Sequence, residues 1–144
     1  IKFAFDDAVL TSKLIDGTFP DYQRVIPVNN DKEMVVDRKA LTDAVDRVSA
    51  ISSEKSRAVK LTINGDTLSL SASSPENGTA QEDVEITYGA DVIEIGFNSA
   101  YLLDIARQLD SETATFVLAD AASPTIIRGA NDTGTIYVLM PMRV

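Results

Sequence analysis

The segment EMVVDRKALTDAVDRV, residues 33–48, decides the fold, because it joins a strand pattern directly to a helix pattern. Residues 33–36 form a short run typical of a strand. Asp37 follows in the position of a helix N-cap, where a carboxylate accepts a hydrogen bond from a free backbone N–H. The next apolar residues recur at helical spacing: Leu41, Ala44, Val45 and Val48. The segment therefore predicts a strand that leads at once into a helix.

The same order of elements then occurs a second time. Three alternating strands follow the first helix, and a new strand at residues 92–97 leads into a helix that Asn98 caps. Three more strands come after that helix. The strands that follow the two helices are centred on Leu61, Leu70, Ile86, Phe116, Ile126 and Val138. The unit is β-α-β-β-β, repeated at a period of roughly 55–60 residues.

One copy of this unit has a single short helix, which cannot cover both faces of its strands. We therefore predict an α+β fold in which two copies close one core, with both helices packed on the same side of an antiparallel sheet. The polar faces of the two helices should then point outward together.

The first residues stand outside the repeat. Ile1–Phe5, a turn at Asp6 and Asp7, and Ala8–Leu14 predict a β-hairpin, followed by a connecting segment with two prolines. We interpret residues 1–22 as the last hairpin of a preceding domain plus a linker, and residues 23–144 as a complete domain. An isolated hairpin is marginally stable, so we expect it to dock on the main body or to exchange with a neighbouring molecule. The chain starts in mid-pattern without Met, which suggests truncation.

Composition excludes most familiar chemistry. The 144 residues contain no cysteine and no histidine, which removes disulfides, thiolate sites, the commonest general base and the commonest zinc ligand. Paired carboxylates such as Asp6 with Asp7, or Asp43 with Asp46, are far more often solvated than catalytic. No apolar run approaches the roughly 18 residues of a membrane span. We expect a globular, non-catalytic protein without cofactors or metal sites.

The net charge of −9 argues against general attraction to nucleic acid, but the charge is unevenly distributed. From position 38 to position 57 there are five basic and three acidic residues. The basic ones are Arg38, Lys39, Arg47, Lys55 and Arg57. A charge run of this kind is usually a solvated helix face.

The C-terminal segment TIYVLMPMRV, residues 135–144, predicts an apolar strand that runs to the end of the chain. Met140 and Met142 bracket Pro141, which removes a backbone donor. Methionine can repack around different guests, so the segment is a candidate docking surface. The alternative is that it is only the last core strand of the domain.

Four segments together resemble the bacterial DNA polymerase III beta subunits, the replication sliding clamps. They are LIDGTFPDYQRVIP (residues 14–27), SEKSRAV (53–59), IGFN (95–98) and YVLMPMRV (137–144), and they occur in the order that the family has. The resemblance spans the whole chain, as the end of the family's second domain and its complete third domain. It implies the DNA-clamp fold, in which helices line the hole of a ring and sheets form the outside.

The resemblance implies that the full protein encircles duplex DNA without reading its sequence, as a cytoplasmic processivity factor and a homodimeric ring. Retention would then be topological, so a mildly basic inner face is sufficient. The candidates for that face are Arg38, Lys39, Arg47, Lys55, Arg57 and Arg107. A peptide-binding or adhesion module without a DNA role is the alternative that the repeat and the apolar tail alone would support.

Family resemblance also implies a hydrophobic cleft that binds short linear motifs ending in leucine and an aromatic residue. The partners implied are the polymerase III alpha subunit, the clamp loader, repair polymerases and mismatch-repair proteins. Carried over by motif position, the cleft residues are Pro20, Arg24, Val25, Asn98, Tyr101, Val138, Met140, Pro141, Met142 and Arg143. The small loop Ala121–Pro124 departs from the family pattern and should alter the rim. Without the wall from the rest of the second domain, we expect weakened affinity.

Ring closure is the third implied site. The matching region lies around Ala50 and Ile51, with Glu76 and Glu82 as ion-pair partners for the next subunit. Exposed ion pairs contribute about 0–1 kcal/mol each, so Ile51 should matter more than either glutamate. With the first domain missing, we expect a monomer, although an exposed sheet edge could produce a non-native dimer.

Overall fold

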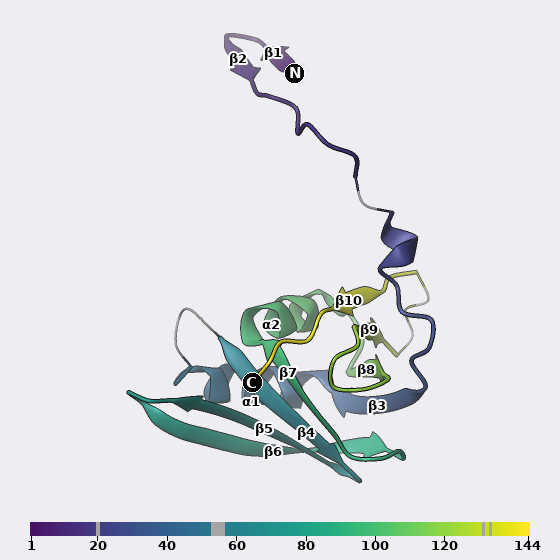
Figure 1. The fold of residues 1–144 in the computed structure, drawn as a ribbon. Coiled ribbons are helices and arrows are strands. Elements are labelled where there is room, and N and C mark those ends of the chain that lie inside the picture. The colour runs from purple at the N-terminus through teal and green to yellow at the C-terminus, as the bar shows by residue number, and fades with distance from the viewer. Residues whose placement is uncertain (20, 53–56, 131, 133) are drawn as a thin grey trace.

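The computed structural model describes residues 1–144 apart from positions 20, 53–56, 131 and 133. It contains the two predicted β-α-β-β-β units in succession (Figure 1). The first comprises β3 (Lys32–Asp37), α1 (Arg38–Ser49), β4 (Ala58–Asn64), β5 (Thr67–Ser74) and β6 (Gly78–Tyr88). The second comprises β7 (Ile93–Asn98), α2 (Ser99–Gln108), β8 (Thr113–Leu118), β9 (Thr125–Gly129) and β10 (Tyr137–Leu139). The predicted α+β class and the repeat are confirmed.

The two units exchange their first strands. The strand order is β10-β9-β8-β3-β6-β5-β4-β7, and every neighbouring pair is antiparallel. The opening strand of the first unit, β3, pairs with β8 of the second, whereas β7 of the second unit pairs with β4 of the first. Neither unit therefore completes its sheet alone, and the two share one core.

Strand β6 connects the two halves of the sheet and leaves part of one edge open. Its residues Gly78–Glu85 pair with β5, and only Ile86–Tyr88 pair with β3. Among the described residues, Gly78–Glu85 therefore have a strand partner on one side only. We call this stretch the open edge of β6; such an edge can accept a strand from another chain.

Both helices lie on the same face of the sheet and contact each other, as predicted (Figure 1). Asp37 accepts a hydrogen bond of 2.7 Å from the Ala40 N–H and caps α1, and Asn98 accepts one of 2.9 Å from the Ala100 N–H and caps α2. The predicted apolar positions of α1 are all buried: Leu41, Ala44, Val45 and Val48. Local capping and periodicity were therefore sufficient to locate both helices.

The core lies between the helices and the sheet, and both units contribute to it. On β4 the side chains alternate, so that Val59, Leu61 and Ile63 are buried and their neighbours are not. The largest fully buried side chains are Phe97, Phe116, Met34, Leu41, Leu61, Ile63, Leu68, Leu70, Ile95, Leu118, Ile127 and Val36. This one-sided burial matches an antiparallel sheet with one face covered.

The N-terminal hairpin consists of β1 (Lys2–Phe5) and β2 (Ala8–Thr11), followed by the 3₁₀ helix η1 (Tyr22–Arg24). The hairpin is confirmed, but β2 ends three residues before the predicted Leu14. In Figure 1 the hairpin lies away from the main body, and every one of its residues is exposed. Of the two expected alternatives, docking on the main body is therefore wrong for this chain, since the apolar side chains of the hairpin are exposed. Exchange with a neighbouring molecule stays a prediction.

The C-terminal strand is shorter than predicted. Pairing with β9 covers only Tyr137–Leu139, and Leu139 is the last buried residue of the chain. Pro141 has no N–H to donate, so regular pairing cannot continue past it. The remaining residues, Met140–Val144, are called the tail below.

Candidate functional site

The tail crosses β7 at Gly96, at the opposite end of the strand order from β10. The Met142 N–H donates a hydrogen bond of 2.9 Å to the Gly96 carbonyl. A Cβ atom on Gly96 would lie 2.5 Å from Val144 Cγ1 and 2.6 Å from the Met142 carbonyl oxygen. Glycine inside a strand commonly marks such a close approach of another backbone.

The tail forms one wall of a pocket of about 560 Å³, called the tail pocket. It is lined by Glu94, Gly96, Ala121, Ala122, Pro141, Met142, Arg143 and Val144. Most of these residues present apolar atoms, while Glu94 and Arg143 supply one charge of each sign. A pocket of this size, with apolar and polar surface in comparable amounts, suits a few side chains of a peptide.

The loop between β8 and β9 supplies the facing rim and is held in shape by Asp120. One oxygen of its carboxylate accepts hydrogen bonds of 2.8 Å from the N–H groups of Ala122 and Ser123, and the other accepts one of 3.0 Å from the Ser123 hydroxyl. These hydrogen bonds, led by the one from Ala122, lower the pKa of Asp120 below its ordinary value. The folded loop therefore favours the ionised carboxylate.

Ionisation of Asp120 should make a small contribution to the fall in the free energy of unfolding at low pH. Because the folded state lowers the pKa of Asp120, its stabilisation is present above the ordinary aspartate value of about 3.9 and is lost as the pH falls through the lowered value. We expect the free energy of unfolding to fall less between about pH 5 and pH 2 in Asp120→Asn, which keeps an acceptor oxygen but cannot ionise. Urea denaturation across that range measures the difference. Asp104→Asn, an exposed change on α2, is the control, and an equal decline in all three proteins would contradict the prediction.

A second hollow of about 460 Å³ shares Val144 with the tail pocket. It lies over β4, β5 and β6, and its other lining residues are Ala58, Lys60, Ser71, Ala72, Ser73, Thr79, Ala80 and Gln81. Lys60 lines this hollow, Glu94 lines the tail pocket, and the two form an ion pair of 2.6 Å. Val144 and this ion pair therefore lie between the two depressions.

Three of the predicted cleft residues meet in the tail pocket: Pro141, Met142 and Arg143. Val138 is half-buried in β10, and Met140 is exposed. The side-chain oxygen of Asn98 accepts the capping hydrogen bond of α2, and Tyr101 is exposed on that helix. None of these four lines the pocket, and Pro20 lies outside the described residues.

The linker residues of the predicted cleft also lie apart from the pocket lining. Arg24 is highly exposed on η1 and forms an ion pair of 3.4 Å with Asp21, and Val25 follows it as an exposed C-cap. Sequence reasoning missed Glu94, Gly96 and Val144 as lining residues. The signal that could have found Gly96 is a glycine inside an otherwise apolar strand.

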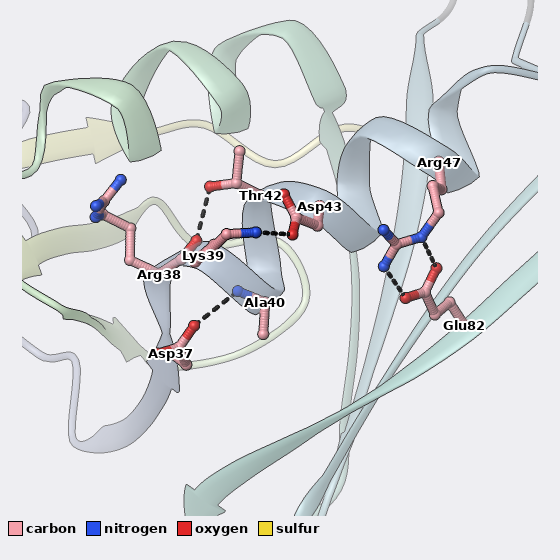
Figure 2. Close-up of polar contacts among 8 residues, drawn as sticks. All are labelled: Asp37, Arg38, Lys39, Ala40, Thr42, Asp43, Arg47 and Glu82. Carbon is pink, nitrogen blue, oxygen red and sulfur yellow. Dashed lines mark hydrogen bonds and ion pairs between the residues drawn. The ribbon is translucent and has the colours of Figure 1, made fainter.

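The basic residues of α1 are largely engaged within the chain (Figure 2). Arg38 is half-buried and donates from Nε to the Ser111 carbonyl over 2.9 Å. Lys39 pairs with Asp43, one turn further along the helix. Arg47 donates from Nε to Glu82 over 2.9 Å and makes a second bond to the same carboxylate, which links α1 to β6. The hydrogen bond from Arg47 lowers the pKa of Glu82.

The outward helix surface is therefore only mildly basic. Helix α1 carries three basic and two acidic residues, and α2 carries one of each. Arg57 and Arg107 are exposed, and neither has an ion-pair partner among the residues that the structure describes. Lys55 lies outside that part of the chain.

Three of the four predicted interface residues lie at one end of the molecule. Ala50 and Ile51 follow α1, and the Asn77 side chain donates a hydrogen bond of 3.2 Å to the Ile51 carbonyl. Glu76 is next to Asn77 in the exposed turn between β5 and β6. Glu82 lies on the open edge of β6 and is engaged by Arg47. No cluster of three or more possible metal ligands occurs among the described residues.

Comparison with known sequences identifies the family. The sequence model described as "DNA polymerase III beta subunit, C-terminal domain" matches residues 23–143. The chain belongs to this family. The curated relatives named beta sliding clamp include that of Caulobacter vibrioides, 49% identical over all 144 residues, and that of Escherichia coli, 40% identical over the same length. The chain spans 39% of the length of each of these relatives.

Solved structures of the family agree with the fold. The chain is similar to the sliding clamp of Bartonella birtlesii, crystallised bound to griselimycin, with a TM-score of 0.89 and 52% identity. That match covers 99% of this chain and 38% of the other. The clamp of Pseudomonas aeruginosa matches with a TM-score of 0.88 and 40% identity over 94% of this chain and 37% of the other. The clamp fold is thus confirmed, and a peptide-binding or adhesion module without a DNA role is not favoured. In the described part of the chain, no helix has both the length and the apolar character needed to cross a membrane.

Proposed function

We propose that this chain is the C-terminal part of a sliding clamp subunit, which encircles duplex DNA and tethers replication and repair proteins to it. The observation that carries the proposal is the match to named beta sliding clamps along the whole chain, at 49% identity for one of them. The intact protein acts as a non-catalytic processivity factor in the cytoplasm and requires no cofactor.

DNA retention by a ring needs little from this surface. Because the duplex is enclosed, the helices must only tolerate a sliding backbone, and weak contacts to phosphate are compatible with movement. The proposed DNA-facing residues are Arg38, Lys39, Arg47, Lys55, Arg57 and Arg107. The acidic partners of Lys39 and Arg47 moderate the attraction, in agreement with a ring that slides rather than grips.

The tail pocket is the proposed docking site for partner motifs. Its apolar walls suit a leucine and an aromatic side chain, whose burial contributes roughly 3–6 kcal/mol before ordering costs. A free peptide should then bind in the millimolar to micromolar range, which allows partners to exchange. The polymerase III alpha subunit, the clamp loader, repair polymerases and mismatch-repair proteins are the proposed partners. The other proposed cleft residues, including Arg24, Val25 and Tyr101, would contact longer guests from outside the pocket.

The domain boundary and the edge that closes the ring are also part of the proposal. We assign residues 1–22 to the preceding domain and its linker, because the hairpin stands apart in Figure 1 and the family match starts at residue 23. Residues 23–144 form the third clamp domain. The open edge of β6 is proposed to pair with the next subunit and close a homodimeric ring, supported by Ala50, Ile51 and Glu76 at the neighbouring end of α1.

Retention on circular as against linear DNA provides the direct test of the proposed function. The full-length protein, loaded by its clamp loader, should be retained on a closed circular duplex and released when one cut makes the duplex linear. Gel filtration of labelled protein with each DNA measures retention. A protein that stays on both forms equally, or that is never retained on the circle, would contradict the proposed function.

A further inference from the structure

Gly96 is a buried glycine in the middle of a regular strand, and its backbone does not require glycine. It is not among the glycines with positive φ. Its neighbours Ile95 and Phe97 are fully buried, and they point into the core. Because side chains alternate along a strand, the missing side chain of Gly96 would point the other way, towards the tail.

Space is what glycine provides here. The nearest atoms to a Cβ at this position would be Val144 Cγ1 at 2.5 Å, the Met142 carbonyl oxygen at 2.6 Å and Val144 Cγ2 at 2.6 Å. The valine side chain can rotate away, but the carbonyl oxygen belongs to the tail backbone. An alanine at position 96 therefore cannot be accommodated unless that backbone moves.

We propose that Gly96 is the positioning residue of the tail pocket: its bare Cα seats Val144 while its carbonyl holds the Met142 N–H. The inference rests on the proposed function of this pocket. Half of the lining residues belong to the tail, so the place where the tail rests determines the shape that a guest encounters. The single hydrogen bond of 2.9 Å to Gly96 then fixes a segment that Pro141 keeps from regular pairing.

Gly96→Ala tests this role in the 144-residue chain. We expect the dissociation constant of a synthetic peptide ending in Leu-Phe to rise about tenfold, and the Met142 amide to lose its protection from hydrogen exchange. The melting temperature should change little, because β7 keeps its pairing with β4. Gly89→Ala is the matched control, since a Cβ there meets no atom within 4 Å.

A double variant separates displacement of the tail from a direct clash with the guest. Val144→Gly removes two of the three crowded atoms, so in the Gly96→Ala background it should restore part of the affinity relative to the effect of Val144→Gly alone. Unchanged affinity in Gly96→Ala, or lost affinity with a Met142 amide that remains protected, would overturn the inference. If the unsubstituted chain binds no peptide, the proposed docking role of the tail pocket fails instead, and amide exchange still tests the positioning by Gly96.

Discussion

Deletion of Met140–Val144 is expected to weaken binding of a peptide ending in Leu-Phe, with a dissociation constant raised by about 10- to 100-fold. The tail supplies Pro141, Met142, Arg143 and Val144, which are half of the pocket lining. Losing half of an apolar contact worth roughly 3–6 kcal/mol corresponds to that change. Fluorescence anisotropy with labelled peptide measures it directly.

The deleted chain should remain folded, because the last buried side chain is Leu139, with 6% exposure. Circular dichroism and thermal melting should therefore resemble those of the intact chain. Gly89→Ala again serves as the control, since a Cβ there meets no atom within 4 Å and Gly89 does not line the pocket. Affinity that survives the deletion would show that the guest binds elsewhere.

Phe97→Ala is expected to lower the free energy of unfolding by about 3–5 kcal/mol. Phe97 has 0% exposure, and its partner in register on β4 is the equally buried Val59. Truncation removes a large apolar side chain and leaves a cavity that packed neighbours fill only in part. Since domains of this size are stable by roughly 5–15 kcal/mol, the loss is a large share of the total.

Urea denaturation followed by circular dichroism measures this loss, provided that the slope of the transition stays constant. Val92→Ala, just before β7 and 56% exposed, should stay within about 0.5 kcal/mol of the unsubstituted chain. A loss below about 1.5 kcal/mol in Phe97→Ala would mean that the core tolerates the cavity by collapsing around it.

Local signals predicted most of the fold. The caps at Asp37 and Asn98, the helical spacing after them and the alternation on β4 all act between residues close in sequence, and the structure contains each of them. The C-terminal segment, residues 135–144, was predicted as one long strand because its residues are apolar, yet pairing stops at Leu139, before Pro141. The hairpin's own pattern was correct, but nothing in it indicated a partner surface.

The site was predictable only in part. Pro141, Met142 and Arg143 could be named from a motif, because they are consecutive in the chain. Ala121 and Ala122 were known only as an unusual rim, and Glu94, Gly96 and Val144 were missed. Their roles arise from contacts between residues that are tens of positions apart.

The sequence by itself determined the order of the elements, the helix caps, the buried helix faces and the family to which the chain belongs. Only the tertiary structure decided that β3 and β7 exchange between the units, that Arg47 is engaged by Glu82, and that the tail rests on Gly96. The physical reason is that periodicity and capping report interactions within a few residues. Which strands become neighbours depends instead on how the whole set of apolar faces closes one core.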